Sequence, residues 1–385
     1  MRSNKHLALA LVFIFCLSFI FPAAAGAEET TKTTLGLQEA LDSAYENSAD
    51  IRLAELSVQS AQNSFDDAAK VVYYIPGGGI VEPAEQQLVN NYQQAIISLH
   101  LAQKSQDAAK DSVYESVIIA YCTAVKNYNS MENANLALQD LQAQKKISSL
   151  ANLVGTVSNY DYTQMDTSIK QAEETYQSAK SSYDGSIASL RALLGKSDDW
   201  QPDLTTRAVI IKYDRDSLDT EINRGTSEST LVYTKKALLD IENSKKYWTL
   251  VNEDTKVKQI NLEEASINYD QARLSARTNI EQLYYGIDTL EGQIEAAELA
   301  YQSAQDNLKN CQLKYDLGMI AQRSLTSGGE SLASAQLTAE KAKVSVENAK
   351  IDLASEKAQF AYLTGQTVYD EKDWTVNTPV DTTAK

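Results

Sequence analysis

Residues 162–194 read YTQMDTSIKQAEETYQSAKSSYDGSIASLRALL, and their spacing decides the fold class. The less polar residues recur in steps of three and four: Tyr162, Met165, Ile169, Ala172, Tyr176, Ala179, Tyr183, Ile187, Leu190 and Leu194. This spacing predicts a narrow apolar seam on one face of a helix, as in coiled coils. Residues 325–363 repeat the pattern in steps of three, four and seven, beginning with Leu325. A seam this thin favours an extended helical bundle or tube over a globular core.

The distribution of proline allows very long helices. Prolines occur only at positions 22, 76, 83, 202 and 379, so residues 84–201 and 203–378 contain none. Ala, Leu, Gln, Lys, Glu and Ser dominate these stretches, and they suit helices. A helix over 84–152 would span on the order of 100 Å, which is far longer than a compact domain needs.

The sequence also indicates an internal duplication. Apolar and polar residues around a glycine interrupt both halves, at 153–158 and at 317–321, as expected of tight turns between antiparallel helices. Each half closes on a glycine, Gly195 or Gly365. The two openings are also alike, since Ala40-Leu41-Asp42-Ser43 resembles Ser217-Leu218-Asp219-Thr220. We therefore expect two tandem helical-hairpin repeats, 28–204 and 205–385, each with a short helix, a long helix and a helix after the tip.

The offsets between the copies predict where they differ. Aligning Leu41 with Leu218 makes the second copy 14 residues shorter between opening and tip, and we assign this difference to a non-helical loop at 71–83. The second copy is expected to turn near 252–255, although one unbroken helix over 228–316 remains an alternative. Seven extra residues after the second tip equal one heptad, which would keep a helical seam in phase. The link 196–216 and the tail 366–385 should pack together.

The N-terminus indicates export. Arg2 and Lys5 precede an apolar stretch, and small residues follow it, so 1–27 are predicted to be a signal peptide. An uncleaved anchor is the alternative. Removing these residues changes the formal charge from −17 to −19. Such acidity argues against nucleic acid and anionic lipid surfaces as partners. No later stretch approaches the 18 apolar residues of a membrane-spanning helix.

The remaining chain is poor in catalytic side chains. His100 is its only histidine, and Cys122 and Cys311 are its only cysteines. This composition excludes His/Cys zinc clusters, and we expect no catalytic, metal or cofactor site. An exported enzyme of this composition could use only carboxylate chemistry. Cys122 and Cys311 lie at different distances before the tips of their copies. Along parallel helices this offset places them too far apart for a disulfide, so we predict two free thiols.

These features resemble the TolC family of outer membrane efflux proteins. The resemblance is carried by 37–48, by Tyr315-Asp316-Leu317-Gly318-Met319-Ile320 and by the glycine closing each copy. It implies an exported trimer whose hairpin tips contact a periplasmic adaptor (membrane-fusion) protein linked to an inner-membrane pump. The tip residues that it implies for this contact are Gly155, Thr156, Val157, Ser158, Gly318, Met319, Ile320 and Ala321. The alternative is that these residues only reverse the chain.

One departure from the family shapes the fold prediction. Membrane strands need about 9–11 residues each, and neither 71–83 nor the second copy provides two of them. We therefore predict an all-α protein of two long antiparallel coiled-coil hairpins, a TolC-like helical tunnel without the membrane β-barrel. The expected function is an oligomeric duct or adaptor-binding sleeve in the cell envelope. A helical scaffold or spacer with no transport role is the alternative.

Overall fold

The computed structural model describes residues 34–75, 79–205, 208–211, 215–245, 248–250, 255–325, 329–369 and 374–377. Contacts group residues 34–385 into one unit, which is the subject of everything below. The predicted signal peptide, 1–27, lies outside the described residues.

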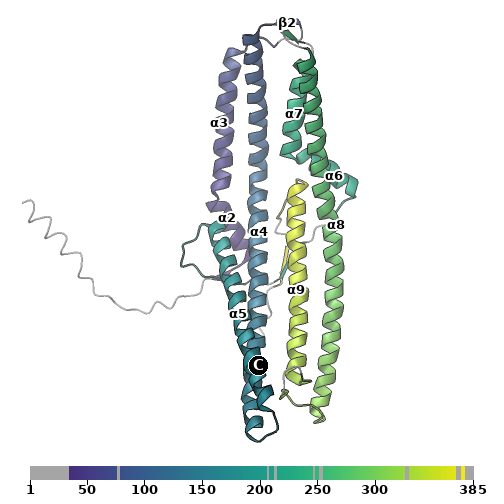
Figure 1. Ribbon diagram of the computed structural model, residues 1–385. Helices are drawn as coiled ribbons and strands as arrows, with labels where there is room; N and C mark the ends of the chain where they lie inside the picture. The colour runs from purple at the N-terminus through teal and green to yellow at the C-terminus, as the bar shows by residue number, and fades with distance from the viewer. Residues whose placement is uncertain are drawn as a thin grey trace, which may run out of the picture. The chain divides into compact units, whose positions relative to one another are not determined.

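The first copy consists of four helices: α2 (Leu37–Asn47), α3 (Ala49–Val71), α4 (Pro83–Leu153) and α5 (Asn159–Leu194). The second copy follows the same order: α6 (Leu218–Glu228), α7 (Thr230–Lys245), α8 (Thr255–Asp316) and α9 (Leu332–Leu363). In each copy the long helix packs against the short helices before it and the helix after the tip (Figure 1). The all-α hairpin fold expected from the seam is therefore confirmed. With 71 residues, α4 is about 105 Å long at 1.5 Å per residue.

Serine and proline residues set where these helices start. The hydroxyl oxygens of Ser158, Ser217 and Ser331 accept hydrogen bonds from backbone N–H groups in the first turns of α5, α6 and α9. Pro83 is the first residue of α4, where its missing N–H costs nothing. Ser48 separates α2 from α3, and Ser229 separates α6 from α7, so both copies break their first helix at the same place.

This shared break corrects the alignment of the two copies. Helices α2 and α6 both have 11 residues and both end one residue before a serine, so Leu37 corresponds to Leu218, an offset of 181. The alignment of Leu41 with Leu218 was wrong by one helical turn, because leucine recurs at that spacing on the same face. The second copy is shorter because its helices are shorter: α7 has 16 residues against 23 in α3, and α8 has 62 against 71 in α4.

The structure excludes one alternative for the connections and corrects one expectation. Residues 252–254 of the turn expected near 252–255 lie outside the described residues. A strand, β5 (Trp248–Leu250), separates α7 from α8, so the unbroken helix over 228–316 was wrong. It pairs in parallel with β2 (Gly79–Val81), which lies in the corresponding connection of the first copy. After the second tip, α9 begins at Leu332 and not near Leu325. The seven extra residues of the second copy therefore lengthen the connection before α9 and do not add a heptad to that helix.

Two further strand pairs involve the link that follows α5, one pair in each copy. Strand β1 (Thr34–Leu35) pairs in parallel with β3 (Asp203–Leu204). Strand β4 (Ala208–Ile211) pairs antiparallel with β6 (Trp374–Asn377) and also contacts α9. The predicted packing of the link against the C-terminal tail is thus confirmed.

The main core lies where α2, α4, α5 and α9 meet. Leu41, Ile118, Leu190 and Ile351 are fully buried there, and the buried Tyr121 hydroxyl donates a hydrogen bond to the Leu35 carbonyl at 3.0 Å. Cys122 belongs to this core, whereas Cys311 belongs to a smaller cluster with Leu332 and Ala335. Both thiols are free and buried, as predicted. Across the described ranges, no helix combines the length and the apolar character needed to cross a bilayer.

Candidate functional site

The first tip is a tight glycine turn between α4 and α5. Gly155 has φ +77°, a left-handed conformation that a glycine adopts without strain. The Thr156 N–H and hydroxyl both donate to the Ala151 carbonyl at 2.9 Å, which caps the end of α4. The Ser158 hydroxyl donates to the Asp161 carboxylate at 2.7 Å and accepts from the Asp161 N–H at 3.1 Å.

The second tip begins with the same turn. Gly318 has φ +68°, and its N–H donates to the Tyr315 carbonyl at 2.9 Å. The Met319 N–H donates to the Lys314 carbonyl at 2.8 Å. The chain then continues to Leu332 before the next helix starts. Only after this longer connection does α9 turn back along α8.

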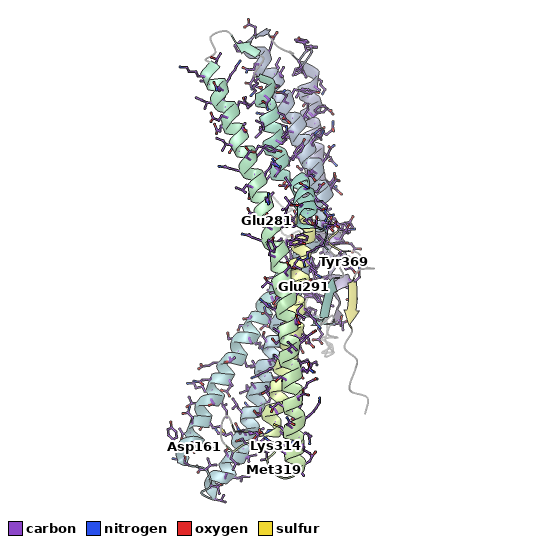
Figure 2. All side chains as sticks on the ribbon, turned by 90° about the vertical axis from the view of Figure 1, so that its right-hand side faces the viewer. Asp161, Glu281, Glu291, Lys314, Met319 and Tyr369 are labelled. Atoms are coloured by element: carbon purple, nitrogen blue, oxygen red, sulfur yellow. The ribbon has the colours of Figure 1, made fainter. Side chains whose placement is uncertain are left out.

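The longer second connection ties the two tips together. The Ser148 hydroxyl of α4, which is fully buried, donates to the Leu325 carbonyl at 2.6 Å. The Arg323 side chain forms an ion pair with Asp140 of α4 at 3.2 Å. Figure 2 accordingly shows Asp161 of the first hairpin and Lys314 and Met319 of the second at the same end of the helices. Both copies thus place their tips at the same end of the helices.

An ion pair also holds this connection to its own hairpin. Lys314 of α8 contacts Glu330 at 2.5 Å. This contact lowers the pKa of the Glu330 carboxyl and raises the pKa of the Lys314 ammonium, mainly through the hydrogen bond between them. Both side chains are about half exposed, so the pair orders the connection more than it stabilises the fold.

The end surface is rich in exposed apolar side chains. Seven of them, between 59% and 81% exposed, form what we call the tip surface: Leu150, Leu153, Val154, Tyr160, Leu313, Leu317 and Met319. Exposed apolar patches of this kind commonly mark a site of interaction with another protein. The tip surface can therefore bind another protein by burying apolar area.

The structure separates the eight tip residues implied by the resemblance into two groups. Gly155, Thr156, Ser158, Gly318, Met319 and Ala321 are exposed. Val157 is buried, and Ile320 is half-buried against the Cys311 cluster. These two occupy equivalent positions, two residues after each tip glycine, and close the hairpins from inside. Their side chains pack against the turns, more deeply for Val157 than for Ile320.

The sequence reasoning missed Leu153, Val154 and Leu317 as surface residues. The signal was present, because these apolar residues fall in the turns and off the helical seams. Asp161 and Asp166, beyond the first tip, serve local structure: Asp161 caps α5 with Ser158, and Asp166 forms an ion pair with Lys145. Within the described ranges, no three His, Cys, Asp or Glu side chains are placed to hold a metal ion.

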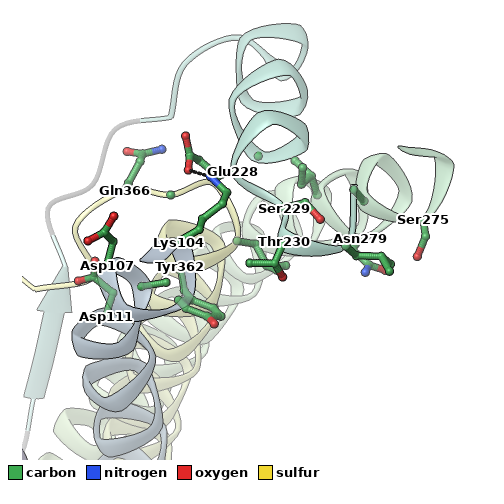
Figure 3. Close-up of a pocket in the computed structure, with 17 residues that line it drawn as sticks. Lys104, Asp107, Asp111, Glu228, Ser229, Thr230, Ser275, Asn279, Tyr362 and Gln366 are labelled. Carbon is green, nitrogen blue, oxygen red and sulfur yellow. Dashed lines mark hydrogen bonds and ion pairs between the residues drawn. The ribbon is translucent and has the colours of Figure 1, made fainter. Parts of the chain in front are cut away.

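A cavity of about 430 Å³ lies far from the tips, where α4 meets the break between α6 and α7 (Figure 3). Lys104 crosses it to contact Glu228 at 2.5 Å. Asp111 accepts a hydrogen bond from the Val368 N–H at 3.3 Å, and burial raises the pKa of this carboxyl. Polar and charged side chains thus line a junction between the two copies.

Comparison with known proteins agrees with this geometry. Residues 197–356 match the sequence model of a family described as outer membrane efflux protein. Among curated proteins, none matches the chain significantly.

The fold is similar to solved outer membrane proteins at low sequence identity. For the CmeC outer membrane channel of Campylobacter jejuni the TM-score is 0.63 at 14% identity, over 87% of this chain and 87% of that one. For the open state of the MtrE outer membrane channel of Neisseria gonorrhoeae it is 0.60 at 12% identity, over 86% and 89%. For the outer membrane protein VceC of Vibrio cholerae it is 0.59 at 14% identity, over 86% and 97%.

At 12–14% sequence identity, the similarity to these structures shows a shared fold. The family model adds a similarity in sequence. Together, the match over residues 197–356 and the shared fold confirm the resemblance to the TolC-type outer membrane efflux proteins that the sequence predicted.

Proposed function

We propose that this protein is an efflux or export component of the cell envelope, working as an oligomeric helical duct whose tip surface docks a periplasmic adaptor protein. The observation that carries the proposal is the tip surface, where both copies of the repeat expose apolar residues at one end. The similarity to outer membrane efflux proteins supports the efflux role. By the same resemblance the oligomer is a trimer, and an inner-membrane pump is the further partner. The function needs no catalytic residue.

Cross-linking in living cells tests the docking. A photoreactive amino acid at Leu153 or Leu317 is expected to form an adduct with another envelope protein, whereas the same residue at Tyr73 is not. Tyr73 is a suitable control because it is 95% exposed and follows α3 at the end opposite the tips. Substituting Leu153→Glu and Leu317→Glu together should abolish export of a dye by the producing strain while leaving the protein folded.

The mass of the purified protein in solution tests the duct. A stable trimer by light scattering, without detergent, supports the proposal. A monomer at micromolar concentration, together with no adduct at either tip, would favour the alternative role as a helical scaffold or spacer.

A further inference from the structure

The cavity of Figure 3 lies at the junction within the chain, where four elements of the two copies meet. Residues 104–111 of α4 form one wall, and the break between α6 and α7 forms a second. Residues 275–280 of α8 and the end of α9 complete it. Its volume of about 430 Å³ falls in the range of pockets that hold small organic ligands, about 300–1,000 Å³. The junction therefore has room for a molecule that neither copy could enclose alone.

Apolar side chains line part of this cavity. Ile280 is buried, and Ala108 and Ala276 are half-buried. The half-buried Tyr362 also lines the cavity and packs against the main core. An aromatic ring offers a ligand both apolar area and a face that attracts cations. The lining thus provides contact area for a ligand with an apolar part.

The charged side chains of the lining leave the cavity negative. Lys104 and Glu228 neutralise each other through their ion pair at 2.5 Å. Asp107 and Asp111 have no ion-pair partner in the part of the chain that the structure describes. They lie one turn apart on α4, and Figure 3 shows their carboxylates one above the other. The cavity thus carries two negative charges that no ion pair neutralises.

The lysine next to Asp111 in the sequence lies elsewhere. The Lys110 Nζ atom is 5.6 Å from the centre of the Tyr45 ring and 5.2 Å from that of Tyr114, and neither ring lines the cavity. Asp111 accepts the Val368 N–H on its Oδ1 atom only, which leaves Oδ2 for a ligand. Burial raises the pKa of the Asp111 carboxyl because the charged form loses contact with water. An ammonium group brought against this carboxylate would favour the charged form again.

The lining favours an organic cation over a metal ion. Within the described ranges, no three acidic, histidine or cysteine side chains are placed to hold a metal. Asp107 and Asp111, in contrast, can share the three N–H donors of one ammonium group. The side chains of Thr230, Ser275 and Asn279 also line the cavity and can form hydrogen bonds with a polar ligand. This chemistry fits an ammonium group attached to an apolar body.

We propose that the cavity at the junction within the chain binds a small organic amine, whose ammonium group contacts Asp107 and Asp111. The apolar part of the amine packs against Ile280 and Tyr362. Because the ligand touches both copies, it holds α4 against the second copy and raises the unfolding temperature. The inference goes beyond the proposed duct and does not rest on it, since all the residues that line the cavity belong to one chain.

Three ligands with the same carbon skeleton test the proposal by isothermal titration calorimetry at pH 7, on the full-length protein purified from the producing cells. We expect 4-phenylbutylamine, which carries an ammonium group, to bind at one site per chain with a dissociation constant of about 1 mM or less. The neutral 4-phenylbutanol and the anionic 4-phenylbutyrate should each bind at least tenfold more weakly. The series keeps the apolar part constant and changes only the charge.

Two variants locate the binding in the cavity. Asp111→Asn removes one carboxylate, keeps an acceptor for the Val368 N–H, and should weaken binding of 4-phenylbutylamine at least tenfold. Ala276→Leu keeps every charge but fills part of the space, and it should weaken binding as well. Asp184→Asn is the matched control, because Asp184 is an exposed acid of α5 outside the cavity. Circular dichroism shows whether each variant is folded.

Three results would overturn the site. The first is the absence of saturable binding of 4-phenylbutylamine. The second is equal binding of all three ligands, which would show an apolar patch without charge selection. The third is an equal loss in Asp184→Asn and Asp111→Asn, which would show attraction to the acidic chain as a whole. None of these results depends on assembly or on cross-links at the tips, so failure of this site leaves the proposed duct standing.

Discussion

Gly365, two residues after the end of α9, lies so close to Glu228 that a Cβ atom added to it would stand 2.3 Å from the Glu228 Cγ atom. In the first copy, Gly195 lies against Asn47 in the same way, with 3.5 Å between the added Cβ and the Asn47 Cβ. Asn47 and Glu228 are the last residues of α2 and α6. Each copy therefore closes by packing the glycine after its last helix against the end of its first.

These two glycines should differ in how they tolerate alanine. Both are left-handed, with φ +63° and +66°, so Gly195→Ala is expected to lower the free energy of unfolding by about 1 kcal/mol from backbone strain alone. Gly365→Ala should lower it further, because the Glu228 side chain must move and disturb its ion pair with Lys104. Urea unfolding followed by circular dichroism measures both.

A third glycine provides the control. Gly185 lies inside α5, and a Cβ there meets nothing within 4 Å, so Gly185→Ala is expected to stabilise the protein by about 0.5–1 kcal/mol. Equal losses at Gly195 and Gly365 would show that the contact with Glu228 is loose.

Sequence patterns predicted the helices well because proline, glycine and the apolar seam act locally. The two left-handed tip glycines and the proline-free stretches around them were sufficient for the hairpins. The register between copies was not predictable in the same way. Leu37 and Leu41 lie on one face of α2, so a short motif around Leu218 fits either of them, and only the breaks at Ser48 and Ser229 distinguish the two.

The candidate site was predicted less completely than the fold. Glycine identified both turns, but which neighbours face inward depends on the three-dimensional path of the turn. Val157 is therefore buried and Ile320 half-buried, although their sequence surroundings resemble those of the exposed Met319. The connection after Gly318 was also predicted to be too short. Leu325 fitted the apolar seam of the next helix, but it lies in the connection, where its carbonyl accepts a hydrogen bond from the Ser148 hydroxyl.

The hydroxyl of Ser148 should hold the second connection against α4. Ser148→Ala removes its hydrogen bond to the Leu325 carbonyl, and we expect a loss of about 1 kcal/mol in stability. Hydrogen exchange should become faster around residues 322–325 and stay unchanged in the main core. Ser149→Ala is a matched control, because Ser149 is half-buried and its hydroxyl donates to the Lys146 carbonyl of its own helix, not to the connection. If both variants exchange alike, the Ser148 contact does not restrain the connection.

Asp111 should make stability depend on pH at the junction within the chain. Burial raises the pKa of its carboxyl above the value of about 3.9 expected in an unfolded chain. The folded state therefore favours the protonated form, and the contribution to stability falls as the pH rises through the folded pKa. Asp111→Asn keeps an oxygen that accepts from the Val368 N–H, so it should stabilise the protein at pH 7.

The difference between wild type and Asp111→Asn should shrink towards pH 3, where the wild-type carboxyl is protonated as well. Thermal unfolding at several pH values measures this. Asp107→Asn is the control, because Asp107 lines the same cavity but is exposed. A stabilisation by Asp111→Asn that stays constant from pH 3 to pH 7 would contradict the assignment.

The two cysteines should report on separate regions of the structure. Burial in the main core raises the pKa of the Cys122 thiol to about 12, so at pH 8 only about one molecule in ten thousand carries the reactive thiolate. Cys311 is also buried, but in the small cluster beside the second tip. We expect iodoacetamide to modify neither quickly in the folded protein. Since local opening is easier in small clusters near chain reversals, Cys311 should react before Cys122 as urea is raised.

Mass spectrometry of peptides from partly denatured protein gives both rates in one experiment. Leu332→Ala, which removes an apolar neighbour of Cys311, should speed modification of Cys311 and leave that of Cys122 unchanged. Rapid modification of Cys122 in the absence of urea would show that the main core opens without unfolding. A disulfide between the two cysteines would contradict the fold itself, because it would join a residue in the middle of α4 to one near the end of α8.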